Sequence, residues 1–115
     1  MKIKLYGIPN CDTMKKARAW LDAQHVDYEF HDYKKSGIER DTLESWIGSA
    51  GWEVLLNRAG TTFRQLPEAA KADLTAARAL ELMLGQPSMI KRPVLVRGKT
   101  LLVGFSPEKY AAALK

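Results

Sequence analysis

The chain is predicted to adopt an α/β fold, with a mixed four-stranded sheet, flanking helices and a helical insertion. Three observations support this prediction. In residues 2–31, two strand-like segments flank a segment whose apolar residues recur at helical spacing. Residues 39–86 follow a helical pattern throughout. Residues 94–115 return to two short strand-like segments and a closing helix.

The opening part of the chain predicts a β-α-β unit. We expect a strand at residues 2–6, a turn at residues 7–10, a helix at residues 12–24 and a second strand at residues 26–31. The inner face of the helix is expected to hold Met14, Ala17 and Leu21. A loop is expected over residues 33–37, which contain two lysines, a serine and a glycine.

The insertion is expected to begin with one helix and a shorter helical piece. Asp41 can cap the first helix, because its carboxylate can accept a hydrogen bond from a free N–H group of the first turn. Gly48 and Gly51 are expected to interrupt this helix. The shorter piece is expected over residues 52–56.

The second half of the insertion is expected to contain three further helical segments. A threonine, Thr61 or Thr62, can cap a short helical turn. Pro67 opens the next piece, since proline is favoured in first helical turns. Thr75 is expected to cap a longer helix, and Gly85 is its expected C-terminal end.

The last part of the chain predicts a β-hairpin followed by a helix. Residues 94–96 and 101–103 are strand-like, and residues 97–100 form the turn between them. Ser106 can cap the closing helix, with Pro107 at its first position.

The length and composition indicate one domain. With 115 residues, of which 46% are hydrophobic, the chain can bury roughly two thirds of its unfolded surface in a single core. We expect residues 1–36 and 88–115 to form the core of this domain, and residues 37–87 to form the helical insertion.

Charge and cysteine content restrict the class of function. The net charge of +5 comes from 18 Lys and Arg against 13 Asp and Glu, and the basic residues occur in pairs without a long run. Because the aromatic residues are not interleaved with them, we expect no nucleic-acid binding, whereas a pocket for a small anion fits. No apolar stretch is long enough to span a membrane, and one cysteine cannot close an intramolecular disulfide. A cytoplasmic location is therefore predicted.

Cys11 is the residue most indicative of chemistry. It lies where the first predicted strand gives way to a helix, and the free N–H groups of a helix start stabilise a thiolate over a thiol. The alternative is a small buried hydrophobic residue, as most single cysteines are. The polar residues around Cys11 favour the reactive thiol.

No metal site is expected. His25 follows the first predicted helix, and His31 ends the second predicted strand. Neither histidine is spaced with other ligand types as a metal site requires, so both are interpreted as surface residues.

Two segments resemble a known family. Residues 6–17 read YGIPNCDTMKKA, and residues 91–96 read KRPVLV. Together they resemble the arsenate reductase (ArsC) family, which includes the Spx regulators and the YffB-type proteins, and the chain is most similar to the YffB type. The resemblance implies a thioredoxin-like core with a helical insertion. It also implies a cysteine that attacks an oxyanion or a disulfide, with glutathione or a glutaredoxin as electron donor.

The resemblance assigns roles to particular residues. Cys11 corresponds to the nucleophile of the family. Arg92 corresponds to the arginine that precedes the family's proline, and Pro93 corresponds to the cis-proline of thioredoxin-like folds. Thr13 is the expected donor to the thiolate, through its hydroxyl or its N–H group, although a residue with no role beyond starting the helix would look the same.

Other positions depart from the arsenate reductases. The arginine of the insertion corresponds to Asn57 in strict register, with Arg58 beside it, and a surface role for Arg58 remains an equal alternative. The third arginine is absent, because its place is taken by residues 103–106, and the histidine of the family corresponds to Gly7. Three guanidinium groups would hold a tetrahedral oxyanion through paired hydrogen bonds, so these departures disfavour arsenate reduction.

Met14 occupies the position where dithiol oxidoreductases and most Spx proteins have a second cysteine. A mixed disulfide on Cys11 must therefore be released by a thiol from outside the chain, and glutathione is the abundant candidate.

These observations predict a glutathione-dependent thiol reductase that uses one nucleophilic cysteine. The predicted catalytic residues are Cys11, Thr13 and Arg92. The predicted substrate-binding residues are Asn10, Arg58, Arg92 and Pro93. Glutathione is expected as a co-substrate and no cofactor is expected to be bound; the other expected partners are a glutaredoxin and a small oxyanion or disulfide, and a monomer is expected. The alternatives are an arsenate reductase and a non-enzymatic, Spx-like regulator that binds RNA polymerase.

Overall fold

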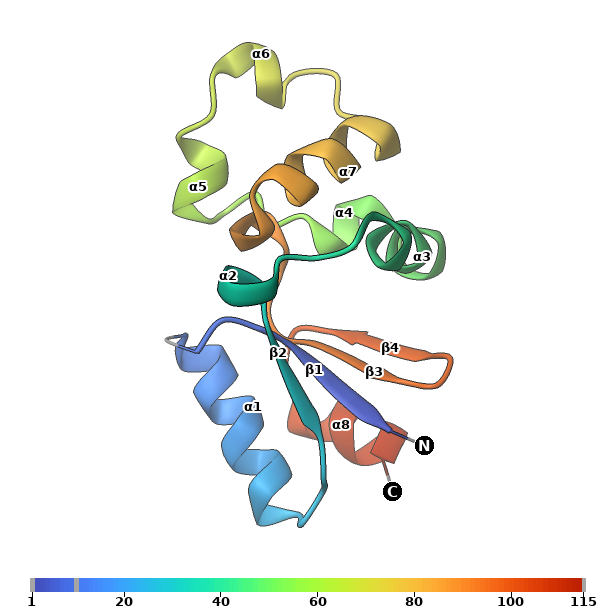
Figure 1. The fold of residues 1–115 in the computed structure, drawn as a ribbon. Coiled ribbons are helices and arrows are strands. Elements are labelled where there is room, and N and C mark those ends of the chain that lie inside the picture. Colours follow the sequence, from blue (N-terminus) through green and yellow to red (C-terminus); the bar gives the residue numbers. More distant parts are fainter. Residues whose placement is uncertain (1, 10, 115) are drawn as a thin grey trace. The chain divides into compact units, whose positions relative to one another are not determined.

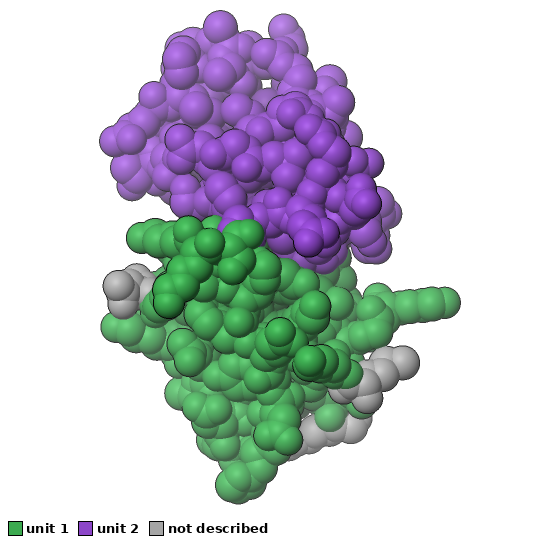
Figure 2. Space-filling model, viewed as in Figure 1, with its two compact units in different colours: residues 1–36, 92–115 green, residues 37–91 purple. Residues whose placement is uncertain are grey.

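The fold is seen in a computed structural model that describes residues 2–9 and 11–114. The chain divides into two compact units, which Figure 2 distinguishes by colour. Unit 1 is made of the residues up to 36 together with those from 92 onward, and unit 2 is made of residues 37–91.

Unit 1 contains a four-stranded sheet (Figure 1). Its strands are β1 (Ile3–Gly7), β2 (Glu29–Asp32), β3 (Val94–Arg97) and β4 (Thr100–Val103), and their order in the sheet is β2-β1-β3-β4. β1 pairs with β2 in parallel, whereas β1 with β3 and β3 with β4 pair antiparallel. The sheet is therefore mixed, which confirms the predicted fold class and its thioredoxin-like core.

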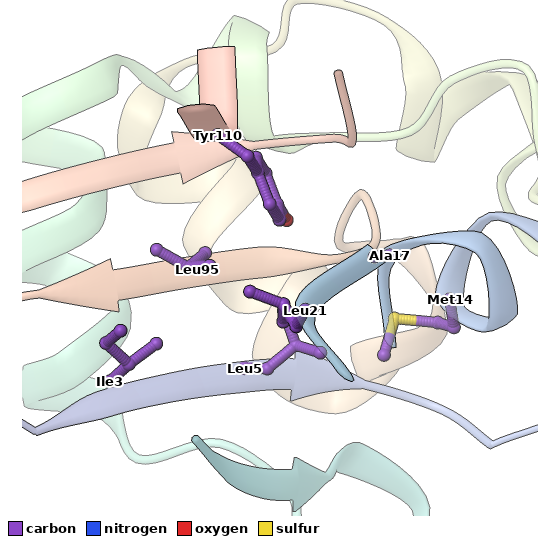
Figure 3. Close-up of a cluster of buried hydrophobic side chains, with 7 residues drawn as sticks. All are labelled: Ile3, Leu5, Met14, Ala17, Leu21, Leu95 and Tyr110. Carbon is purple, nitrogen blue, oxygen red and sulfur yellow. The ribbon is translucent and has the colours of Figure 1, made fainter. Parts of the chain in front are cut away.

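One face of the sheet is covered by α1 (Asp12–Ala23) and α8 (Pro107–Leu114). Side chains from both helices meet those of β1 and β3 in one buried cluster (Figure 3). Its members are Ile3, Leu5, Met14, Ala17, Leu21, Leu95 and Tyr110. The three α1 residues of this cluster are those predicted from helical spacing. Burial of this apolar surface is the main force that holds the helices on the sheet.

The register of the sheet separates its two faces. Leu5 pairs with Leu95, and both belong to the buried cluster under the helices. The next pair is Tyr6 with Val94, whose side chains point to the opposite face because successive side chains alternate along a strand. Tyr6 also pairs with His31 of β2, so that aromatic residues gather on this second face.

The ends of three strands meet at one edge of this sheet. β1 and β2 run in parallel, so their carboxyl ends lie at the same edge, and the antiparallel β3 begins there. Cys11 follows β1, Tyr33 follows β2, and Arg92 and Pro93 precede β3. The sheet topology alone therefore places these residues at a common edge.

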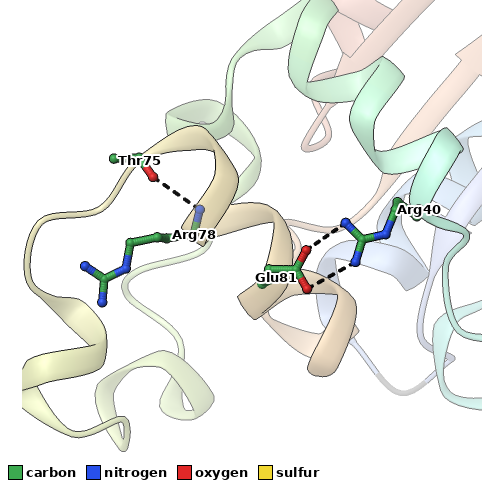
Figure 4. A network of polar contacts seen from close by, with 4 residues as sticks. All are labelled: Arg40, Thr75, Arg78 and Glu81. Carbon is green, nitrogen blue, oxygen red and sulfur yellow. Dashed lines mark hydrogen bonds and ion pairs between the residues drawn. The ribbon is translucent and has the colours of Figure 1, made fainter.

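Unit 2 is helical. Its helices are α3 (Arg40–Ala50), α4 (Trp52–Leu55), α5 (Thr61–Arg64), α6 (Glu68–Lys71), α7 (Ala76–Gly85) and the 3₁₀ helix η1 (Pro87–Met89). As predicted, Thr75 caps α7, and its hydroxyl accepts a hydrogen bond from the Arg78 N–H group at 3.3 Å (Figure 4). Arg40 of α3 donates to both carboxylate oxygens of Glu81 of α7, at 2.7 and 3.1 Å.

Several local predictions differ from the structure. Residues 33–36, predicted as loop, form the short helix α2 (Tyr33–Ser36), because the Asp32 carboxylate accepts a hydrogen bond from the Lys34 N–H group at 2.8 Å. Gly48 lies within α3, which continues to Ala50, and the residue after it, Gly51, has a φ of 90°. The cap position of α3 is Glu39, so the prediction of Asp41 as its cap was wrong.

In the second half of unit 2 the helix starts also differ. Gly60 occupies the cap position of α5. The predicted capping by Thr61 or Thr62 was therefore wrong. Thr62 instead lies 3.1 Å from Ser88, between their hydroxyl oxygens. At the closing helix the prediction was right, because the Ser106 hydroxyl accepts a hydrogen bond from the Lys109 N–H group at 3.4 Å.

Unit 2 extends slightly further along the chain than the expected insertion. Residues 88–91 were expected in the core, but they belong to unit 2. Ile90 forms a β-bridge with Leu56, and the Lys91 N–H group donates to the Leu55 carbonyl at 2.8 Å. These backbone hydrogen bonds hold the end of the segment on unit 2. The break at residue 36/37 is the one that was predicted.

Candidate active site

Cys11 occupies the N-cap position of α1. Its backbone is extended, with φ −126° and ψ 130°, and its carbonyl accepts the Lys15 N–H group at 2.9 Å, which begins the helix. The side chain is half-buried and packs against the cluster under the helices. In this position the sulfur faces the first N–H groups of the helix, which have no carbonyl partner within it.

The environment of the sulfur favours a thiolate. Partial burial on its own raises the pKa of the Cys11 thiol, but the Met14 N–H group, the Arg92 guanidinium and the Thr13 N–H group each lower it, and the net pKa lies below the ordinary value. Within the described residues, the Cys11 side chain makes no conventional capping hydrogen bond at the start of α1. The N–H groups act as electrostatic partners of a large, diffuse anion.

Arg92 lies at the same sheet edge as Cys11, just before β3 begins. It precedes Pro93, and the bond between them is cis in the structure, in agreement with what the resemblance implied. Pro93 is buried, and its carbonyl accepts the Gly104 N–H group at 2.8 Å, which ties it to the end of β4. The Arg92 side chain reaches the sulfur both as a hydrogen-bond donor and as a positive charge.

The structure brings together four of the predicted site residues within unit 1. Cys11, Arg92 and Pro93 meet at one edge of unit 1, and Thr13 adds its N–H group from the exposed first turn of α1. Arg58 belongs to unit 2, where its guanidinium lies over the Trp52 ring, 5.9 Å from the ring centroid. Its role in substrate binding stays a prediction. Asn10 lies outside the described residues.

The positions that lack the family's other cationic groups have structural roles. Asn57 accepts a hydrogen bond from the Ala59 N–H group at 3.2 Å and shapes a turn in unit 2. Gly104 has φ 84°, a conformation that favours glycine. Phe105 packs edge-on against the Tyr110 ring at a centroid distance of 4.9 Å. The segment in place of the third arginine thus supports the core.

Two features of this sheet edge were not predicted from the sequence. The Met14 N–H group acts on the thiolate, and its position three residues after the cap could have indicated this. Tyr33 lies buried at the same sheet edge, and its place directly after a strand was the available signal.

In the described ranges, no three His, Cys, Asp or Glu side chains group as a metal site, and no helix is long and apolar enough to cross a membrane.

Comparisons with known proteins identify similar chains. The model of the ArsC family matches residues 6–113. A solved structure of a YffB protein is 63% identical and covers 99% of this chain and all of its own, with a TM-score of 0.97. An arsenate reductase (ArsC) related protein from Brucella melitensis is 57% identical, covers 100% of this chain and 96% of its own, and has a TM-score of 0.79.

A regulator is also similar to this chain. The global transcriptional regulator Spx of Streptococcus pyogenes is 28% identical over 97% of this chain and 84% of its own length. The family model extends from the last residues of β1 into α8 and includes Cys11, Arg92 and Pro93. The chain therefore belongs to the ArsC family.

Proposed function

We propose that the chain is a thiol–disulfide oxidoreductase in which Cys11 forms a mixed disulfide with glutathione. The observation that carries the proposal is the set of groups around the sulfur. Two N–H groups of the first turn of α1 and the Arg92 guanidinium outweigh the effect of burial on the pKa of Cys11. A thiolate is the form that attacks a disulfide, so these groups favour the reactive state.

The reaction begins with attack of the Cys11 thiolate on one sulfur of a substrate disulfide. A new S–S bond forms, the substrate bond breaks, and the leaving thiolate takes a proton from solvent. A glutathione thiolate then attacks the Cys11 sulfur, releases the second substrate thiol and stays on Cys11. A second glutathione removes the first as oxidised glutathione and restores the Cys11 thiolate. External thiols are required because Cys11 is the only cysteine.

Arg92 has two roles in this scheme. Its charge lowers the pKa of Cys11 in the free protein. Its guanidinium can also hold an anionic group of the incoming thiol, since it presents several N–H donors in a planar fork. The backbone at Arg92 and Pro93 is the edge along which we propose that the tripeptide lies.

Mass spectrometry of the protein incubated with oxidised glutathione tests the proposal. One glutathione is expected to add to the wild type and none to Cys11→Ser, and reduced glutathione or a glutaredoxin is expected to remove it. Failure of the wild type to form the adduct, or an adduct on Cys11→Ser, would contradict the proposal.

Arsenate reduction is the weaker enzymatic candidate. The resemblance associates that reaction with three arginines, and Val103, Gly104 and Phe105 stand in place of one of them. Each lost charge-assisted contact to an oxyanion costs on the order of 1.5 to 3 kcal/mol. Arsenate turnover with glutathione and glutaredoxin should therefore be at least tenfold below that of a three-arginine enzyme measured in parallel. Equal turnover would favour arsenate as the substrate.

The similarity to Spx favours a second candidate, a transcriptional regulator that binds RNA polymerase. Met14 excludes a Cys-x-x-Cys disulfide switch but does not affect protein binding. Co-purification with RNA polymerase distinguishes the candidates. If wild type and Cys11→Ser bind the polymerase equally and no glutathione adduct forms, the regulator replaces the oxidoreductase.

A further inference from the structure

A buried tyrosine lies beside the Cys11 site and is not used by the proposed reaction. Tyr33 opens α2 directly after β2, at the edge where Cys11 and Arg92 also lie. Only 2% of its surface is exposed. Its hydroxyl has no hydrogen-bond partner within the described ranges. Burying a hydroxyl without a partner is unfavourable, so the fold by itself would be served better by phenylalanine.

The ring of Tyr33 is held in place by its neighbours. Its centroid lies 6.3 Å from that of Tyr6, with the two rings stacked, and 6.2 Å from that of His31, with the rings edge-on. Tyr6 and His31 are themselves paired across β1 and β2, with ring centroids 4.8 Å apart. The Asp32 carboxylate fixes the start of α2. The hydroxyl is therefore carried on a side chain with little freedom to turn away.

The surroundings of Tyr33 keep its hydroxyl protonated, so the hydroxyl can donate a hydrogen bond. Burial raises the pKa of the Tyr33 hydroxyl far above its usual value and Tyr6 raises it further, while the Arg92 guanidinium is close enough to lower it in part. The hydroxyl is therefore protonated at neutral pH. Arg92 thus lowers the pKa of both Tyr33 and Cys11, and the three residues lie at the same edge of the sheet in unit 1.

We propose that the Tyr33 hydroxyl and the Arg92 guanidinium together bind a carboxylate of the thiol or disulfide that reacts with Cys11. One positive charge and one neutral donor suit a monovalent carboxylate better than a doubly charged tetrahedral oxyanion, which favours several cations. This inference rests on the proposed function, since it assigns the substrate class of the same site: small acidic thiols and disulfides.

Two alkylating reagents test the carboxylate site without glutathione. With iodoacetate or iodoacetamide the Cys11 thiolate attacks the CH₂ group, an S–C bond forms, and iodide leaves with the electron pair of the C–I bond. The reagents differ in that iodoacetate carries a carboxylate, so the ratio of their rates reports carboxylate recognition beside the sulfur. We expect Tyr33→Phe to lower this ratio about tenfold, as for one hydrogen bond to a charged group. The rate of Tyr33→Phe with iodoacetamide should stay within about twofold of the wild-type rate.

Tyr110→Phe is the matched control. Tyr110 is also fully buried and its hydroxyl also has no hydrogen-bond partner within the described ranges, but it belongs to the cluster under the helices. Tyr110→Phe should leave the ratio unchanged. Both variants should keep or raise Tm, because each removes an unpartnered buried hydroxyl.

The outcomes separate this inference from the proposed function. An unchanged ratio in Tyr33→Phe, an equal fall of both rates, or an equal change in Tyr110→Phe would overturn the carboxylate site. If Cys11 of the wild type reacts with neither reagent, the result would instead contradict the proposed function. A second arm compares exchange with oxidised glutathione and with hydroxyethyl disulfide, which has no carboxylate. A fall in this preference in Tyr33→Phe supports glutathione as the source of the carboxylate, and an unchanged preference excludes it as that source.

Discussion

Gly7 and Met14 are in such close contact that no side chain fits on Gly7. A Cβ atom built there would overlap the Met14 sulfur and lie 2.8 Å from its terminal methyl carbon. Met14 is fully buried, so it has little room to move away. Two of the positions at which the chain departs from arsenate reductases and dithiol proteins, Gly7 and Met14, are therefore coupled sterically. A histidine at position 7 is incompatible with the present packing of Met14.

The contact predicts a coupled effect on stability. Gly7→Ala should lower the free energy of unfolding by about 1 to 3 kcal/mol, the usual cost of overpacking a core. In the Met14→Ala background the added methyl group should cost less, because it enters the space that the truncation leaves. The difference should appear as a coupling of about 0.5 to 3 kcal/mol in a double-mutant cycle measured by urea denaturation. Additive effects would show that Met14 can shift at no cost.

The thiolate environment predicts a low pKa for Cys11. The rate of alkylation by iodoacetamide should rise with pH around a midpoint below the ordinary thiol value of about 8.5. Arg92→Ala should raise this midpoint, because it removes both a hydrogen-bond donor and a charge. Arg92→Lys should restore part of the difference. A wild-type midpoint at the ordinary value would contradict thiolate stabilisation at this site.

The same pKa predicts a pH dependence of stability. The folded pKa of Cys11 is depressed, so the unfolded state binds more protons between the folded and the unfolded pKa, and stability rises with pH in that window. The contribution is complete above the unfolded pKa and is lost as pH falls through the folded pKa. The difference in unfolding free energy between the wild type and Cys11→Ser should therefore increase with pH across this window. A difference that is constant with pH would show equal pKa values in both states.

A second thiol should change the fate of the mixed disulfide. Met14→Cys creates a Cys-x-x-Cys sequence at the start of α1, where an internal thiol can attack the mixed disulfide faster than an external one. We expect oxidised glutathione to yield an intramolecular disulfide in this variant, where the wild type keeps one glutathione. Intact-mass measurement distinguishes the products. Met14→Ala is the control, because it removes the same buried side chain without adding a thiol.

The predictable parts of the chain are those whose signals are local. The alternation and helical spacing of apolar residues located the strands and the helices α1, α7 and α8, because each buries one face within its own unit. Thr75 and Ser106 were identified as caps because a hydroxyl before a helix has one nearby set of free donors. Cys11 was predicted as the nucleophile from its place at a helix start.

Other features depended on residues distant in sequence. The end of unit 2 was placed at residue 87 from the proline and strand pattern, but the bridge between Leu56 and Ile90 extends the unit to residue 91. The Asp41 and Thr61 or Thr62 caps failed, because a capping residue type does not determine which residue takes the extended cap conformation. These details are decided by backbone hydrogen bonds that form only in the folded chain.

The sequence by itself determined the candidate nucleophile, the absence of a second thiol and the types of groups that could surround the sulfur. Only the tertiary structure decided which of these groups meet. β1 and β2 run in parallel and β3 opposes them, so residues from three distant segments, Cys11, Tyr33 and Arg92, reach one edge of the sheet. The physical reason is that strand pairing is a non-local interaction: hydrogen bonds and burial across the sheet set the register, and the register sets which charges act on the thiol.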